Sequence, residues 1–256
     1  MAISRFARMS VFVLIVAALN VADVKAQSPK LDQVVSELIS SKGTLNQRYD
    51  FRFNKDDNGI PILISAVTQK NADAVAILLK NGADPNIEKK KGGGETALFL
   101  VAVSLDDEPD AKIRDEICAK TMKICELLLD AKANANLRNR IDSTPLSVAA
   151  TKGRADICAL LISRGADVNA QNRVGETPLF KAAQGGYWKV VELLLKNKAK
   201  ISSDDKLMSN PLKAAEERSD EKLHKSIRQK LGKSYYIDAD YDKTIDILRK
   251  AAPPSK

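Results

Sequence analysis

Residues 143–150 read STPLSVAA, and residues 176–183 read ETPLFKAA. The two stretches agree at Thr, Pro, Leu and both alanines, and they begin 33 residues apart, at 143 and 176. At the same distance after each comes an apolar run, ICALLI at 157–162 and VVELLL at 190–195. A fixed period of this length predicts a repeat array, in which one supersecondary unit buries its apolar face only by stacking on its neighbours.

Each repeat carries the signals of two short helices. Thr144 is placed to cap the first helix with its hydroxyl, and Pro145 then takes the first helical position, where its missing N–H costs nothing. A second helix is predicted over about 155–163, ending at Gly165, which can take the left-handed C-cap conformation. The turn at 172–175 then leads to the next Thr-Pro pair, with Asn and Gly expected at its positive-φ positions.

Together these residues resemble the ankyrin repeat: Thr-Pro-Leu, the Ala-Ala pair, Gly, Leu-Leu, and the ending Gly-Ala-Asp-Val-Asn-Ala at 165–170. The resemblance implies an all-α fold, an ankyrin-repeat solenoid of helix-turn-helix repeats joined by β-hairpin-like fingers. We expect about four clear repeats with degenerate caps. An unrelated array of helical hairpins is the alternative, but it does not explain why the period and the turn residues agree.

The first 26 residues have the pattern of an export signal. Arg5 and Arg8 supply the positive charge, residues 11–19 form an apolar segment, and Ala26 precedes the predicted cleavage point. The apolar segment is shorter than the roughly 20 residues that span a bilayer, although an uncleaved membrane anchor stays open as an alternative. We therefore expect a periplasmic or secreted protein, cleaved after Ala26, with no stable membrane insertion afterwards.

The repeat pattern divides the whole chain. The predicted segments are a signal peptide (1–26), an N-terminal capping helix region (27–57), the ankyrin repeats (58–203), a degenerate C-terminal repeat (204–233), and a C-terminal helix and tail (234–256). In the first repeat Pro61 stands where the pattern has Thr, and Ile62 stands where it has Pro. The first inner helix is therefore expected to lack the usual cap.

Two stretches depart from the period. About fifteen residues are inserted near 104–119, where we expect an acidic loop and then an outer helix lengthened at its N-terminal end, with Ile113 on its apolar face. In the degenerate repeat, NPL at 210–212 keeps the period, and a charged second helix is predicted at about 220–231. The last helix, at 241–251, is expected to cover the end of the stack.

No residues in the sequence have the spacing of a catalytic or cofactor site. The one histidine, His224, lies in a charged predicted helix, and there is no nucleophile elbow, dinucleotide-binding loop or zinc-ligand pair. The acidic cluster at 106–110 lacks the spaced ligands of a calcium loop. We therefore predict no enzyme, no cofactor and no metal; an enzyme with a scattered site is the disfavoured alternative.

Charge and cysteine content bear on the partners. The chain has 41 Lys and Arg against 33 Asp and Glu, but lysines alternate with acids and aromatic residues are few, so we expect no nucleic-acid partner. In an exported protein Cys118, Cys125 and Cys158 invite a disulfide argument. Stacked repeats lie about 8 to 10 Å apart, however, beyond the roughly 7 Å that a disulfide allows between Cα atoms. We expect buried thiols, and their redox state stays open.

The resemblance implies a scaffold that binds another protein through its fingers and the concave face of its inner helices, and we expect a monomer. The candidate binding residues, carried over by position, are Lys89, Lys90, Lys91, Arg138, Arg140, Lys152, Asn172, Arg173, Lys181, Gln184, Tyr187 and Trp188. Tyr187 and Trp188 are the candidate anchors, because large rigid aromatic residues dominate binding hot spots. Packing between helices is the alternative for both. Replacing both with Ala is predicted to abolish binding without unfolding the array.

Two roles follow from the resemblance to exported bacterial ankyrin-repeat proteins. One is a periplasmic partner that protects another protein in stress defence. The other is an immunity protein that binds and neutralises a toxin. Neighbouring genes separate them, because a catalase-type neighbour favours protection and a toxin-like neighbour favours immunity.

Overall fold

A computed structural model of the chain describes residues 48–49, 60–89, 94–103, 111–201, 210–219 and 240–252. Ten α-helices and two strands of two residues each lie in these stretches. The chain forms two compact units, unit 1 (Met1–Val101 and Ala119–Ala133) and unit 2 (Ala102–Cys118 and Asn134–Lys256). The predicted signal peptide, the helix of the N-terminal capping region and the helix at about 220–231 lie outside the described residues.

Unit 1 begins with a short hairpin and its first helical pair. Strand β1 (Arg48–Tyr49) pairs antiparallel with β2 (Ile60–Pro61). Helix α3 (Ile62–Thr68) follows at once and has no side-chain cap, as the exchange of Thr for Pro61 predicts. Helix α4 (Ala72–Lys80) is capped instead by Asn71, whose side chain accepts a hydrogen bond from the Ala74 N–H at 3.0 Å. Helix α5 (Ala97–Val103) comes next, and its first five residues belong to unit 1.

The predicted lengthening of an outer helix is confirmed in α6 (Ala111–Asp130). This helix has 20 residues, whereas the outer helices of the next two repeats have nine each. Ile124, Cys125 and Leu128 are buried, but the expectation that Ile113 lies on the apolar face was wrong, because 45 % of its surface is exposed. Ile113 lies in the N-terminal turns by which α6 exceeds the ordinary outer helix.

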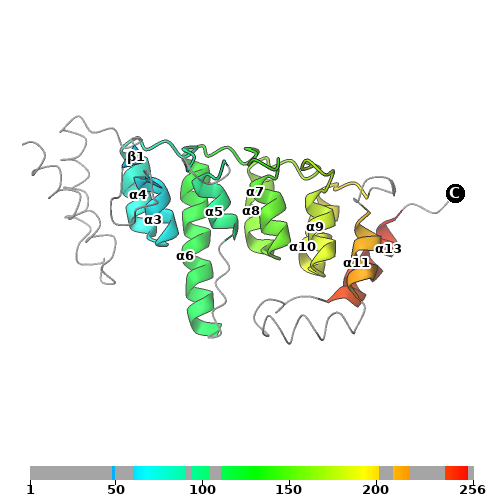
Figure 1. Ribbon diagram of the computed structural model, residues 1–256. Coiled ribbons are helices and arrows are strands. Elements are labelled where there is room, and N and C mark those ends of the chain that lie inside the picture. The colour runs from blue at the N-terminus through cyan, green and yellow to red at the C-terminus, as the bar shows by residue number, and fades with distance from the viewer. Residues whose placement is uncertain are drawn as a thin grey trace, which may run out of the picture. The chain divides into compact units, whose positions relative to one another are not determined.

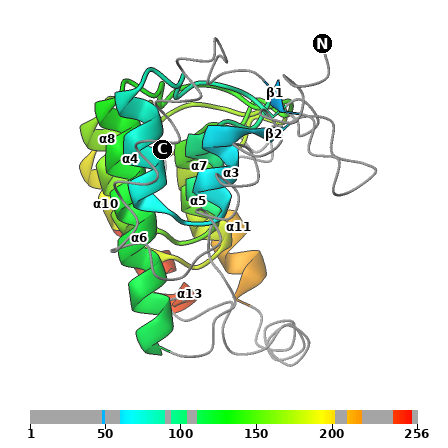
Figure 2. The ribbon, with the colours of Figure 1, turned by 90° about the vertical axis from the view of Figure 1, so that its left-hand side faces the viewer.

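Unit 2 contains the two repeats that the sequence defines best. Helices α7 (Pro145–Thr151) and α8 (Ala155–Ser163) form one pair, and α9 (Pro178–Gln184) and α10 (Trp188–Lys196) form the next (Figure 1). The inner helix α7 packs on α9, and the outer helix α8 packs on α10, so that two layers result (Figure 2). Leu146, Leu161, Leu179 and Leu194 are each fully buried between these layers.

The predicted helix caps are confirmed. The Thr144 hydroxyl accepts a hydrogen bond from the Ser147 N–H at 3.3 Å, and the Thr177 hydroxyl accepts one from the Phe180 N–H at 3.2 Å. Asn210 serves helix α11 (Pro211–Arg218) in the same way. Each cap satisfies a backbone donor that the first helical turn leaves free, which fixes where the inner helix begins.

The outer helix of the last repeat is α13 (Tyr241–Ala251), whose predicted bounds are confirmed. It packs against α11 and α10, and its buried Thr244, Ile245 and Leu248 match Val190, Val191 and Leu194 of α10. These buried positions of α13 therefore follow those of α10 after 54 residues (194 to 248), whereas the repeat period is 33 residues. The sequence assigned this place to the helix predicted at about 220–231, which lies outside the described residues, whereas α13 packs against α11 and α10 and so covers the end of the stack, as the sequence predicts for 241–251.

The cysteines behave as small apolar residues, as expected. Cys125 and Cys158 are fully buried, Cys118 is half-buried, and all three are free thiols. Burial raises the pKa of the Cys158 thiol well above its ordinary value, and the nearby charge of Asp156 adds to the rise. A thiol with a raised pKa is rarely a thiolate, so Cys158 is chemically inert at neutral pH.

In the described part of the chain, no helix combines the length and the apolar character that crossing a membrane requires. The same residues contain no cluster of three or more His, Cys, Asp or Glu side chains that could hold a metal ion.

Candidate protein-binding surface

The predicted anchor Tyr187 is buried and only 8 % exposed. Its ring lies against Gly153 of the preceding repeat and Gly185 of its own, so closely that a Cβ on either glycine would collide with it. Its backbone also caps α10. Tyr187 therefore packs between helices, the alternative considered from the sequence, and its ring does not face solvent as an anchor must.

The second predicted anchor, Trp188, is half-buried at the start of α10. The Lys243 ammonium of α13 lies 3.1 Å from the centroid of its ring, and the Lys189 ammonium lies 5.8 Å away. These are cation–π contacts within one chain. One face of the Trp188 ring is thus already occupied by the helix that closes the array.

The predicted residues of the inner helices are partly engaged as well. Lys181 forms an ion pair with Glu176 at 2.6 Å, in which the two side chains are 20 % and 15 % exposed. Gln184 is half-buried, and its carbonyl oxygen accepts a hydrogen bond from the Tyr241 hydroxyl at 3.1 Å. Lys152 is half-buried at the C-terminal cap of α7. All three residues are thus partly buried, and the Gln184 contact is made by its backbone oxygen.

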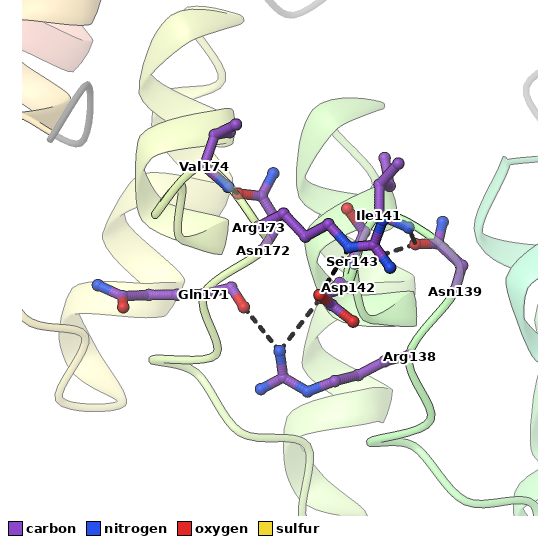
Figure 3. A network of polar contacts seen from close by, with 9 residues as sticks. All are labelled: Arg138, Asn139, Ile141, Asp142, Ser143, Gln171, Asn172, Arg173 and Val174. Carbon is purple, nitrogen blue, oxygen red and sulfur yellow. Dashed lines mark hydrogen bonds and ion pairs between the residues drawn. The ribbon is translucent and has the colours of Figure 1, made fainter.

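Two fingers of unit 2, at 136–143 and 169–176, are joined to each other by arginine side chains. The Arg138 guanidinium donates to the carbonyl oxygens of Gln171 at 2.7 Å and Asp142 at 3.3 Å (Figure 3). Arg173 of the second finger contacts the first finger as well: its Nε donates to the Asp142 carboxylate at 3.0 Å. Arg138 and Arg173 therefore fix one finger against the next.

Each finger is shaped by one asparagine. The Asn139 side-chain oxygen accepts hydrogen bonds from the N–H groups of Ile141 at 3.1 Å and Ser143 at 3.0 Å. Asn172 holds Val174 and Glu176 in the same way, at 3.1 and 2.9 Å. The expectation that Asn172 takes a positive φ was wrong: Gly175 has φ 82° and Asp142 has φ 58°, and both come three residues after the asparagine. The asparagine contributes its side chain, and the third residue after it contributes the left-handed conformation.

The tips of these fingers expose two aliphatic side chains. Ile141 is 58 % exposed and Val174 is 59 % exposed, at equivalent places 33 residues apart in the sequence. Figure 3 shows the two side chains pointing the same way. The sequence prediction missed both, although a signal was present: an aliphatic residue stands at the same point of two turns that otherwise consist of polar residues and glycine.

An arginine precedes each of these aliphatic residues. Arg140 is exposed and makes no hydrogen bond or ion pair with any described residue, so its charge faces solvent. The residues Lys206 and Leu207 repeat the basic and aliphatic pair one period later in the sequence, but they lie outside the described residues. We name the set Arg140, Ile141, Arg173 and Val174 the finger face.

The candidate binding residues Lys89, Lys90 and Lys91 stand in the connection 88–94, which belongs to unit 1. There Glu88 and Thr96 form an antiparallel bridge, and the Lys89 N–H donates to the Glu95 carbonyl oxygen at 3.0 Å. Lys89 is half-buried, and Lys90 and Lys91 lie outside the described residues.

Helical pairs that repeat along the chain, with finger-like turns between them, define a solenoid of stacked repeats. In such a molecule the residues shared by all repeats build the stack, and those that differ at the tips and inner helices are available for binding.

The particular repeat is the ankyrin repeat. Residues 116–205 match the family model for ankyrin repeats, in three copies. The fold is an ankyrin-repeat solenoid. Ankyrin repeats are protein–protein interaction modules and, in general, non-catalytic binding scaffolds.

Three known proteins show the extent of the similarity. Human rabankyrin-5 is 30 % identical over 128 residues, which cover 50 % of this chain and 10 % of that protein. An ankyrin repeat protein of Fowlpox virus (strain NVSL) is 30 % identical over 104 residues, covering 34 % of this chain and 55 % of its own length. An ankyrin repeat protein of Acanthamoeba polyphaga mimivirus is 36 % identical over 99 residues, 37 % of this chain and 16 % of that protein. The chain thus spans only part of each relative.

Proposed function

We propose that this chain is an exported scaffold that binds another protein through the finger face. The observation that carries the proposal is the pair of equivalent, exposed aliphatic side chains, Ile141 and Val174, on fingers that arginine contacts hold together. Exposed aliphatic residues in a fixed array favour association, because burying them against a partner removes apolar surface from water without ordering a mobile loop first.

The test is affinity capture from an extract of the envelope that contains the natural partner. The tagged mature chain is compared with the double variant Ile141→Ser/Val174→Ser. The expected result is one stoichiometric protein that the double variant fails to retain. The control is Ile113→Ser, which removes a similarly exposed aliphatic side chain from α6 and should leave capture unchanged. Equal capture by the wild type and the double variant would remove the finger face from the proposal.

The partner distinguishes the two roles. We propose a resident protein that the array protects, for which stress defence is the expected setting. Recovery of a stoichiometric envelope protein supports this role. If the extract yields no partner while co-expression rescues cells from a toxin, the array is an immunity protein instead.

Export is proposed on the pattern of the first 26 residues, a charged start, an apolar segment and Ala26. N-terminal sequencing of the chain recovered from a periplasmic fraction should begin at Gln27. A chain that keeps Met1 and stays in the cytoplasmic fraction would contradict the proposal.

A further inference from the structure

The finger face combines apolar surface with positive charge. Arg140 and Ile141 on one finger match Arg173 and Val174 on the next in the sequence, and Figure 3 shows the Ile141 and Val174 side chains pointing the same way. A binding partner therefore meets a repeated pattern of cation and aliphatic side chain.

The positive charge of this face is only weakly compensated. Arg138 makes its hydrogen bonds to carbonyl oxygens, and Arg140 has no partner among the described residues. Arg173 pairs with Asp142, but the two side chains are 65 % and 42 % exposed, so the guanidinium stays accessible to a carboxylate of a partner. The other carboxylate of the two fingers, that of Glu176, forms an ion pair with Lys181. The face thus attracts carboxylates.

The spacing of the pattern follows from the repeat. Neighbouring helices pack about 8 to 10 Å apart, and equivalent finger tips are separated by one repeat. An extended segment of the polyproline II type rises about 3.1 Å per residue with three residues per turn, so side chains three residues apart share one side and lie about 9 Å apart. A helix rises about 1.5 Å per residue and covers this distance in about seven residues, two turns.

We propose that the partner presents an acidic and apolar segment to the finger face, with an apolar side chain beside a carboxylate at each of two places, three residues apart if the segment is extended or seven if it is helical. Each apolar side chain packs on Ile141 or Val174, and each carboxylate pairs with the adjacent arginine. This inference rests on the proposed function and specifies the chemistry of its partner.

Two other classes of partner fit the face less well. Ile141 and Val174 together have about half the carbon atoms of a myristoyl chain, which alone gives only marginal binding to a bilayer. A single-stranded nucleic acid is bound by stacking its bases on aromatic side chains, and the finger face has none. A protein segment uses both the aliphatic and the charged groups.

The experiment is selection from a library of random dodecapeptides displayed on phage, with the mature protein immobilised. We expect the enriched peptides to carry Asp or Glu beside an apolar residue, repeated at a spacing of three or seven. A synthetic peptide of the enriched sequence should lose at least tenfold in affinity, measured by fluorescence anisotropy, for Arg140→Glu. Because Arg140 is exposed and makes no hydrogen bond or ion pair with described residues, this substitution should leave the packing intact.

A charge exchange provides the matched control. A peptide whose acids are replaced by lysine should bind the wild type poorly and recover affinity for Arg140→Glu. A structural defect in the variant would lower the affinity for both peptides, whereas direct pairing restores the exchanged combination.

The remaining outcomes separate the two proposals. Peptides that lack acids and ignore Arg140→Glu, yet need Ile141 and Val174, would overturn the acidic partner and leave the proposed function standing. Peptides that bind Ile141→Ser/Val174→Ser as well as the wild type would overturn both. If no peptide is enriched, or if the wild type sediments with phosphatidylglycerol vesicles and the double variant does not, the acidic protein segment is overturned.

Discussion

The ring of Tyr187 lies against Gly153 and Gly185, and one repeat later the ring of Tyr241 lies against Gly186. Each tyrosine begins an outer helix and fills the space that the glycines of the inner-helix turn leave open. Gly153 and Gly186 also both have φ 70°, a conformation that favours glycine. A residue type that the sequence marks as a binding anchor is here a packing element that joins consecutive repeats of unit 2.

Tyr187→Ala should therefore lower the free energy of unfolding by about 3 kcal/mol, as large aromatic truncations in a core do. Trp188→Ala should cost less, about 1 kcal/mol, since Trp188 is half-buried and loses mainly its contact with Lys243. Urea unfolding of the two single variants measures both. This expectation replaces the one from the sequence, that the double substitution leaves the fold intact. Equal, small losses would contradict it.

A second residue-scale prediction concerns the pair Arg154 and Asp156 at the start of α8. Arg154 is 5 % exposed and donates to both carboxylate oxygens, at 2.9 and 2.8 Å. Burial alone would raise the pKa of Asp156, but the hydrogen bonds and the charge of Arg154 outweigh it and hold this pKa below its ordinary value. A lowered folded-state pKa gives stability that is present above the ordinary pKa, about 4, and is lost as the pH falls through the folded-state value.

Asp156→Asn should consequently destabilise the protein at pH 7, and the difference from the wild type should shrink as the pH falls below about 4. Urea unfolding at pH 7 and at several values below 4 measures this. A difference between Asp156→Asn and the wild type that stays constant with pH would show that the ionised carboxylate is not the cause.

At the scale of the element, the outer helices α4, α6, α8 and α10 are each followed within two residues by a residue in the left-handed conformation. Gly82, Lys132, Gly165 and Lys198 take this place with φ between 66° and 88°. Next to it, an asparagine of one repeat binds the backbone of the following one. The Asn136 amide donates to the Gly165 carbonyl oxygen at 2.9 Å, and its side-chain oxygen accepts from the Asp167 N–H at 2.8 Å. Asn169 makes the same contacts to Lys198 and Lys200. The residues that end an outer helix thus also form the hydrogen bonds that join this repeat to the preceding one.

This geometry predicts that Lys198→Gly stabilises the protein. A non-glycine residue in this conformation costs about 1 to 2 kcal/mol, which the substitution by glycine removes. The greater freedom of glycine in the unfolded chain offsets about 0.4 to 1 kcal/mol of this stabilisation. A net increase of about 0.5 kcal/mol or more in the free energy of unfolding is expected. The reverse change, Gly165→Lys, has room for its side chain, because a Cβ at this position would have no neighbouring atom within 4 Å, and should destabilise through backbone strain alone. Thermal unfolding of the two variants should shift in opposite directions; shifts of the same sign would contradict the prediction.

At the scale of the molecule, the parts that the sequence predicts well are those fixed by local residues. Thr144 and Pro145 locate the start of α7, and the apolar spacing locates α8 at 155–163, because cap, proline and apolar spacing all act within a few positions of the helix they define. The exposed tips could not be predicted in this way. Whether Ile141 faces solvent depends on how the whole finger is held, which the Asn139 and Arg138 contacts decide.

The place of the last outer helix likewise depends on packing. Two candidate helices follow α11, at about 220–231 and at 241–251, and both are long enough to pack on it. The period points to the first. The second carries the apolar positions that α10 uses, Tyr241, Thr244, Ile245 and Leu248, and only the packing on α10 and α11 reveals that it fills the place.

The two candidates for the last outer helix differ in which leucine is buried against α10 and α11. Leu248 of α13 is fully buried and equivalent to Leu194 of α10, so Leu248→Ala should cost about 2 to 5 kcal/mol, as Leu194→Ala should. If the helix at about 220–231 were the outer helix, Leu223→Ala would be the costly change and Leu248→Ala a mild one. Urea unfolding of the three variants decides between them. Native-state hydrogen exchange adds a positional readout, because a lost outer helix should first expose the amides of α11 and α10, its direct neighbours, and leave those of α7 and α8 protected longest.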